Sequence, residues 1–438
     1  MRLLRLVLVM LLAVVPLQAG ALSLVRDAEI ERTVARLSHP VFKVAGLSPA
    51  AVTTYIINDR ALQAAVVDGR TMLLFTGLLT TLETPEEVIG VIAHEVGHIA
   101  GGHLARRSVA LRNARGPALL ALLAGVLAGA AGGPEAGIAL GSGAQGIIQR
   151  AFLRYNRGEE AAADQAALRY LERLDIDPRG LQAVLERFRG QEVLSAGNVD
   201  PYVLTHPLSS ERLQLVERRV AETEGRQWRQ DPELEYWFGR MQAKLSGFLD
   251  RPNRVLRNYE GDDSEAGLMA RAVALHRLPS PSEAIATIDR LLAKRPNDPF
   301  YLELKGQILH ENGRAEEAVP YYRRAVGLAP SEPLLKAGLG RTLLALDTAA
   351  ADREALEVLK AARAADRGDV TAMRDLATAY ARAGDTAMAT LATAERFALL
   401  GRTEDAVFHA KRATAMLSEG SPGWLRARDI VALDRSAE

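Results

Sequence analysis

The sequence contains no cysteine among its 438 residues. Disulfide bonds are therefore excluded, and so is a lipid anchor attached through a cysteine behind an export signal. The chain also lacks net charge, because 54 basic residues balance 54 acidic ones, and it offers no electrostatic footprint for nucleic acid or for an anionic membrane. Aromatic residues make up only 5% of the chain, whereas Ala and Gly are abundant, a composition that favours closely packed helices.

The first residues have the pattern of an export signal rather than of a folded element. Arg2 and Arg5 form a basic start, and residues 6–15 are an unbroken apolar run. The small residues at 19–21 then predict cleavage after Ala21. An uncleaved anchor is the less favoured alternative, because the apolar run is shorter than the ~20 residues that span a bilayer. We therefore expect an exported bacterial protein of the periplasm, soluble or only peripherally attached to a membrane.

The segment that follows predicts a helix and a small sheet. Residues 24–36 repeat apolar side chains at helical spacing. Residues 53–57, 64–67 and 71–76 are apolar runs with the pattern of strands. The Asp68-Gly69 pair between the last two predicts a hairpin turn.

A second helix is predicted from residue 84 onward. Thr84 can cap it, Pro85 suits the first helical position, and Glu87 completes a capping box. We expect this helix to run past His103.

Residues 117–147 are a segment rich in Gly, Ala and Leu. Its apolar run is interrupted at residues 132–135, short of the ~20 residues of a spanning helix. A buried or site-covering helical hairpin is therefore favoured over membrane insertion, and peripheral contact with a membrane stays an alternative. Beyond it the sequence predicts two helices and a loop before a closing helix: 157–174, a helix reaching 189, a polar loop over 190–201, and 228–249.

From about residue 252 the pattern changes to paired short helices. Residues 297–330 place small residues, a bulky residue and a closing proline where a 34-residue tetratricopeptide unit needs them: Gly306, Gly313, Ala318, Tyr322, Ala325 and Pro330. Weaker units precede and follow this one. Such arrays stack into a curved solenoid with a concave binding face.

The segment His94-Glu95-Val96-Gly97-His98 carries the clearest chemistry in the chain. Positions i and i+4 of a helix lie one turn apart on one face, so His94 and His98 can direct their imidazoles to one zinc ion. Glu95 projects beside them, where it can act as the general base for a water that zinc activates. The uncharged neighbours of this motif indicate a buried helix rather than a surface one.

Catalytic zinc requires a third protein ligand and an open position. His103 lies about two and a half turns after His94, so in a continuous helix it should point away from the metal. His206 is a further candidate. Glu160 and Asp164 are better placed, one turn apart on a predicted helix, where one could bind zinc and the other could accept the outer N–H of a ligating histidine.

These segments together resemble the HtpX-like and CAAX-prenyl-protease-like zinc metallopeptidases. That family has H-E-x-x-H followed by S-R-x-x-E-x-x-A-D, and here Arg157, Glu160, Ala163 and Asp164 fall in register. Asn156 stands where the family usually has serine.

The resemblance implies roles for the matching residues. Glu160 is selected as the third zinc ligand, with Asp164 and Arg157 supporting the ligands. Residues 205–207 with Arg212 resemble a later T-H-P-x-x-x-x-R segment over the active site. It implies that His206 contacts the metal or the developing oxyanion, and that Arg212 steadies the region. The strand 71–76 would line the cleft and pair with an extended substrate.

The sequence thus predicts a mainly α protein in three parts: a signal peptide (1–21), an α+β zincin-type metallopeptidase domain with a small β-sheet (22–250), and an α-helical tetratricopeptide-like solenoid (251–438). A periplasmic member with repeats is expected to bind one Zn²⁺ per chain and to cleave misfolded or stalled outer-membrane proteins. The repeats would recruit protein substrates or the outer-membrane assembly machinery. Two alternatives stay open, a chaperone or scaffold with minor protease activity and an integral membrane protease that uses 117–147 as a span.

Overall fold

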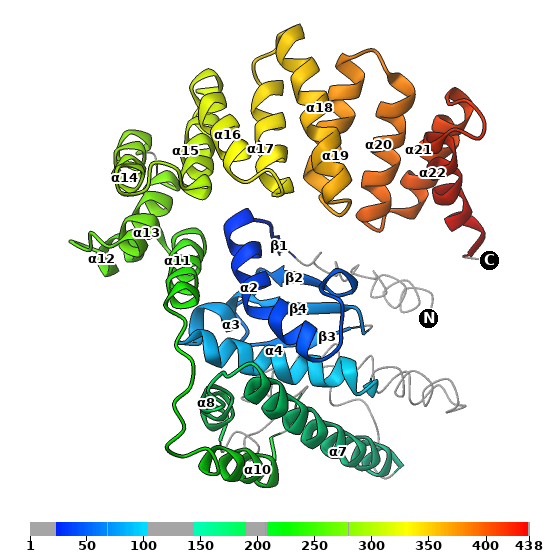
Figure 1. Ribbon diagram of the computed structural model, residues 1–438. Helices are drawn as coiled ribbons and strands as arrows, with labels where there is room; N and C mark the ends of the chain where they lie inside the picture. Colours follow the sequence, from blue (N-terminus) through cyan, green and yellow to red (C-terminus); the bar gives the residue numbers. More distant parts are fainter. Residues whose placement is uncertain are drawn as a thin grey trace, which may run out of the picture.

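The computed structural model describes residues 23–67, 69–103, 144–189, 206, 208–278 and 280–436, and only the backbone of 144–156. The predictions for the export signal, for most of 117–147 and for the loop 190–201 lie outside the described residues. Figure 1 shows two parts, a group of helices around a small sheet and an arc of helix pairs that extends above it.

Within the described ranges, the small sheet has four strands in the order β1-β2-β4-β3. Its strands are β1 (Leu24–Val25), β2 (Thr53–Ile57), β3 (Ala64–Val66) and β4 (Thr71–Phe75). β3 and β4 form the antiparallel hairpin that the sequence predicts, and β2 runs parallel to β4. Because β4 has a neighbour on each side, the prediction that this strand pairs with an extended substrate is wrong. Among the described strands, β3 forms that edge of the sheet.

The first helix differs from its prediction at both ends. α2 spans Ala28–Val44, and the Asp27 side chain caps it by accepting a hydrogen bond from the Ile30 amide. Leu24 and Val25 pair with β2 instead of starting the helix. Apolar spacing alone did not distinguish this short strand from a helical turn.

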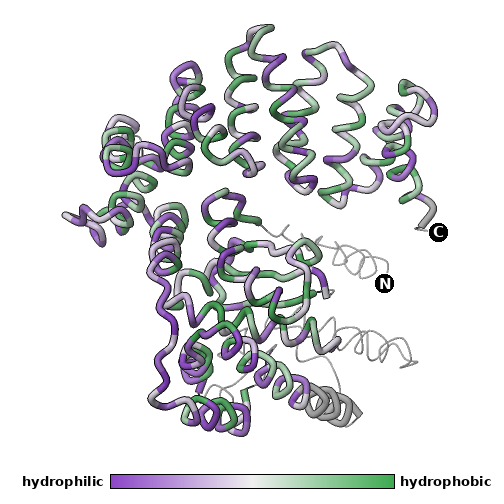
Figure 2. The backbone as a smooth tube through the Cα atoms, in the orientation of Figure 1, coloured by the Kyte–Doolittle hydropathy of each residue, from purple (hydrophilic) through white to green (hydrophobic). Residues whose placement is uncertain are grey.

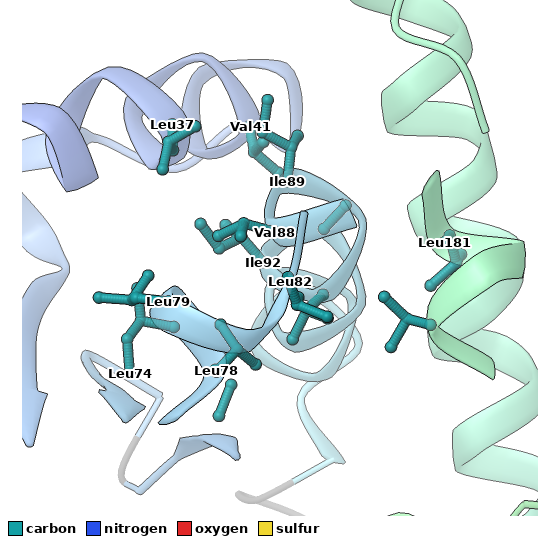
Figure 3. Close-up of a cluster of buried hydrophobic side chains, with 14 of the residues drawn as sticks. Leu37, Val41, Leu74, Leu78, Leu79, Leu82, Val88, Ile89, Ile92 and Leu181 are labelled. Carbon is teal, nitrogen blue, oxygen red and sulfur yellow. The ribbon is translucent and has the colours of Figure 1, made fainter. Parts of the chain in front are cut away.

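The helices of the first part enclose one apolar core. They are α3 (Thr76–Thr81), α4 (Pro85–Ala100), α7 (Ala144–Arg173), α8 (Arg179–Arg187), α10 (Ser210–Ala221) and α11 (Pro232–Leu249). Figure 3 shows how Val88 and Ile92 of α4 meet Leu37 of α2, with leucines of β4, α3 and α8 around them. α4 is therefore the central helix of this part, and almost all of its side chains are buried.

The second part is a series of antiparallel helix pairs, as the sequence predicts. After α12 (Pro252–Asn258) come α13 (Glu265–His276), α14 (Pro281–Lys294), α15 (Pro299–Glu311), α16 (Ala315–Leu328), α17 (Pro333–Leu344), α18 (Ala349–Ala365), α19 (Val370–Arg382), α20 (Thr386–Leu399), α21 (Thr403–Met416) and α22 (Pro422–Val431). The mainly helical fold with a small sheet and a repeat array is confirmed.

Hydropathy follows this architecture. Figure 2 shows hydrophobic and hydrophilic stretches alternating along the helices of both parts, whereas the segment joining α10 to α11 is hydrophilic and mostly exposed. None of the helices in the described ranges is long and apolar enough to cross a membrane.

A buried network of charges joins the two parts. Arg240 of α11 is 1% exposed, and its Nε donates to Glu29 of α2 at 2.6 Å. Its Nη1 donates to Asp298 at 2.6 Å, and Asp298 caps α15 of the repeat array. One turn along α11, Lys244 is fully buried and its Nζ lies 2.8 Å from Asp27. Burial lowers the pKa of Lys244, but the surrounding carboxylates outweigh this effect and raise the pKa, so the ammonium stays charged.

Further ion pairs attach α2 to more distant repeats. Arg32 donates to Glu332 at 3.0 Å, just before α17, and Arg26 pairs with Asp366, just after α18. The repeat array is thus connected to the peptidase part by ion pairs from α2 and from the residues just before it. This arrangement predicts that the two parts move as one body.

We expect Arg240→Met to lower the free energy of unfolding by about 3–5 kcal/mol, because it removes the guanidinium that pairs with the buried carboxylates of Glu29 and Asp298. Urea unfolding followed by circular dichroism measures the change. Exposed Arg251 of the same region is the matched control, and Arg251→Met should change stability by about 0.5 kcal/mol or less. If the two substitutions changed stability equally, the conclusion that the buried ion pairs of Arg240 hold the two parts together would be contradicted.

Candidate metal centre

α4 presents its motif to a buried site. Thr84 caps the helix by accepting from the Glu87 amide, and the Glu87 carboxylate in turn accepts from the Glu83 amide. His94 and Glu95 are fully buried and His98 is 3% exposed. The Nε2 atoms of the two histidines lie 3.1 Å apart, as the one-turn spacing predicts.

α7 brings the second motif against the first. A Cβ on Gly97 would lie 2.9 Å from the carbonyl oxygen of Ala163, so the two helices touch at this point because glycine has no side chain. The contact places Glu160 and Asp164, both fully buried, beside the histidines. Any larger residue at Gly97 would push α7 away and would separate the two halves of the site.

Four side chains converge on one point: His94, His98, Glu160 and His206, whose ligating atoms all lie within 4.8 Å of one another. His94 Nε2 lies 3.2 Å from Glu160 Oε2 and 3.4 Å from His206 Nδ1. His98 Nε2 lies 3.3 Å from Glu160 Oε1, and His206 Nδ1 lies 3.2 Å from Glu160 Oε2. Ligands at ~2.0–2.1 Å in tetrahedral zinc sites are about 3.3 Å apart, so these separations fit one zinc ion.

Buried carboxylate oxygens that accept no hydrogen bond support the same conclusion. Among the described residues, Glu160 Oε1 and both carboxylate oxygens of Glu95 have no hydrogen-bond donor. Glu95, Glu160 and Asp164 are acidic and buried, and within the described part of the chain Arg212 is the one permanent cation in their cluster. A divalent cation would balance this excess of negative charge. The donor set of imidazoles and a carboxylate is one that zinc prefers.

Arg212 and Asp164 support the ligands from behind. Arg212 is 2% exposed, and its Nε and Nη2 donate to the two oxygens of Asp164 at 2.7 and 2.9 Å. Asp164 Oδ1 also lies 2.8 Å from His94 Nδ1, which fixes the orientation of that imidazole. Burial raises the pKa of Asp164, but Arg212 and His94 outweigh it and lower the pKa to about 2, so this carboxylate stays ionised. Arg212 Nη1 also lies 3.2 Å from Glu160 Oε2.

The electrostatics around the ligands favour positive charge. Burial lowers the pKa of His94, but Asp164 and Glu160 outweigh it and raise the pKa to about 10. Burial likewise raises the pKa of Glu160, whereas the three histidines around it lower the pKa well below its ordinary value. The site therefore stabilises a cation at the position where the ligating atoms meet.

Two features of the site differ from the sequence-based expectation. The structure does not place Arg157 in the cluster: its side chain is exposed, one turn before Glu160 on α7.

α4 also ends at Ala100 rather than continuing past His103, and His103 lies against the ligand His98. The glycines at 101 and 102 are the sequence signal for this helix end. Residues 205 and 207 lie outside the described residues.

Comparison with known proteins supports the metal site that this geometry indicates. Residues 25–220 match Peptidase family M48, and residues 281–333 match a tetratricopeptide repeat. The putative beta-barrel assembly-enhancing protease of Vibrio cholerae is 27% identical over 64% of this chain and 58% of that protein. The beta-barrel assembly-enhancing protease of Escherichia coli is 24% identical over 84% of this chain and 75% of that protein.

Among solved structures, the repeat protein YrrB aligns over 40% of this chain and 91% of its own length, with 19% identity and a TM-score of 0.33. The family match and the relatives together confirm the resemblance to zinc metallopeptidases that the two motifs indicate. The chain therefore joins a peptidase family M48 domain, the domain of a zinc metalloprotease, to tetratricopeptide repeats, and it is homologous to the beta-barrel assembly-enhancing proteases.

Proposed function

We propose that this protein is a periplasmic zinc-dependent endopeptidase that cleaves misfolded or stalled outer-membrane proteins. The observation that carries the proposal is the Glu95 carboxylate, which is buried beside the ligand cluster. Among the described residues it accepts no hydrogen bond, although His206 Nε2 lies 3.3 Å from its Oε1. A carboxylate in that position is available to take a proton from water.

His94, His98 and Glu160 would hold the ion, and Asp164 and Arg212 would keep His94 and Glu160 in place. A bound zinc ion would polarise the substrate carbonyl and lower the pKa of a water molecule. Glu95 accepts the proton of the attacking water at one carboxylate oxygen, and it returns that proton to the departing amine. The deep burial of these groups excludes bulk water and strengthens each of these interactions.

His206 gives the site a resting state. Its Nδ1 completes the group of four ligating atoms, and its Nε2 lies 3.3 Å from Glu95 Oε1. With zinc bound, the histidine would take the ligand position that substrate needs, and it also contacts the general base. His206 therefore has to leave before cleavage can begin.

The repeats suit recruitment of protein substrates or of the outer-membrane assembly machinery, because tetratricopeptide arrays bind partners on a concave face. The relatives are named for enhancing β-barrel assembly, which favours outer-membrane proteins as the substrate class. The export signal predicted over residues 1–21 favours the periplasm. A chaperone or scaffold with minor protease activity is the second candidate, favoured by the repeat array itself, which can bind protein without cleaving it.

We expect Glu95→Gln to lower the rate of cleavage of an unfolded outer-membrane β-barrel protein by about 10²–10⁴-fold, because the amide cannot accept the proton. Zinc content, measured on the same samples, should not change. Glu86→Gln at the start of the same helix is the matched control and should keep full activity. Cleavage by Glu95→Gln at the control's rate would refute the proteolytic mechanism and would favour the chaperone.

We expect His206→Ala to keep bound zinc and to raise the basal cleavage rate, because the fourth ligand position opens. A tenfold rise would correspond to a resting state favoured by about 1.4 kcal/mol. His39→Ala, at an exposed histidine of α2, serves as the control. Unchanged cleavage together with an unchanged Co²⁺ spectrum would show that His206 does not gate the site.

A further inference from the structure

We propose that His103 is a positioning residue that holds the zinc ligand His98 in its binding orientation. This inference rests on the proposed function, since it assumes that His98 binds a metal ion. It concerns the outer nitrogen of that ligand, which no residue of either sequence motif reaches.

The two ring nitrogens of His98 face different partners. Nε2 points to the ligand cluster, 3.1 Å from His94 Nε2 and 3.3 Å from Glu160 Oε1. Nδ1 lies 2.8 Å from Nδ1 of His103. The two rings meet edge to face, with centroids 4.9 Å apart and an interplanar angle of 78°. Both imidazoles are 3% exposed, so the contact is sheltered from water.

The backbone turns at the end of α4, and this turn brings His103 against His98. Five residues along a continuous helix amount to about 500°, which would turn His103 away from His98. Instead α4 ends at Ala100, and Gly102 adopts a φ of 63°, a conformation that glycine adopts without strain. Gly101 leaves room for the ring, because a Cβ there would lie 2.5 Å from His103 Nε2. The helix end and the histidine therefore form one local unit.

The chemistry of the contact assigns the donor and the acceptor. A neutral imidazole that binds zinc through Nε2 carries its only proton on Nδ1. That N–H of His98 must then donate to Nδ1 of His103, which accepts as a neutral imidazole. A hydrogen bond of this kind fixes the rotation of a ligating ring, and its loss typically weakens metal binding by 10–100-fold.

The other ligating histidine has a different partner. His94 donates from Nδ1 to the ionised carboxylate of Asp164, which Arg212 holds in place. A carboxylate adds negative charge to its ligand, whereas the His103 imidazole does not. His103 thus orients His98 without adding to the negative charge that the site already carries.

The test measures zinc affinity of the full-length protein by competition with a chelator, together with the visible spectrum of the Co²⁺-substituted protein. We expect His103→Ala to raise the zinc dissociation constant about 10–100-fold and to alter the Co²⁺ spectrum. His103→Asn should restore most of the affinity, because its side-chain oxygen can accept the same hydrogen bond. Gly101→Ala, which displaces the ring without changing it, should weaken zinc binding as well.

His39→Ala is the control and should bind zinc as tightly as the wild type. If His103→Ala kept wild-type zinc affinity and an unchanged Co²⁺ spectrum, the positioning role of His103 would be refuted and the proposed function would stand. Failure of the wild-type protein to bind zinc or Co²⁺ would overturn the proposed function together with the positioning role. If His103→Ala does not fold, the comparison of His103→Asn with Gly101→Ala still decides, since equal affinities for these two would contradict the positioning role.

Discussion

The negative charge buried between α4 and α7 is the constraint on which the rest of the site depends. Glu95, Glu160 and Asp164 are buried, and Arg212, which contacts Asp164 and Glu160, supplies one permanent positive charge against three carboxylates. Burying unbalanced charge costs several kcal/mol per group, so a divalent cation is the natural partner of this arrangement. The helices that supply the carboxylates can pack this closely because Gly97 lets α7 contact α4 directly. Metal binding and the packing of the peptidase core are therefore two aspects of one contact.

A second network of buried charges, at the junction between the two parts, is governed by the same requirement that buried charges be paired. Arg240 and Lys244 lie on one helix, α11, and their carboxylate partners come from α2 on one side and from α15 on the other. Charged groups in such a position need all their partners, so the network favours one relative placement of the repeats and the peptidase part. The concave face of the array is then held at a constant position with respect to the site.

The sequence predicted the parts of the site that follow from local geometry. One helical turn between His94 and His98, and one between Glu160 and Asp164, are enough to predict which side chains share a face. The choice of Glu160 over Glu159 came from resemblance to a family, because both carboxylates lie on the same predicted helix. The structure places Glu160 among the ligating atoms.

The remainder depends on contacts that no local pattern contains. The return of His103 to His98 depends on a helix end at two glycines, and the exposed position of Arg157 depends on how α7 is oriented. The ion network around Arg240 joins residues that are 58 and 211 positions apart, which spacing arguments cannot connect. The second neighbour of β4 likewise comes from the parallel pairing with β2, which the predicted hairpin did not include.

The measurement that tests the central claim most directly is zinc K-edge X-ray absorption of the full-length protein with its metal content determined in parallel. The account predicts one zinc per chain with four nitrogen or oxygen neighbours at about 2.0–2.1 Å and the outer scattering of imidazole rings. Zinc well below one per chain, or bound without imidazole, would contradict it.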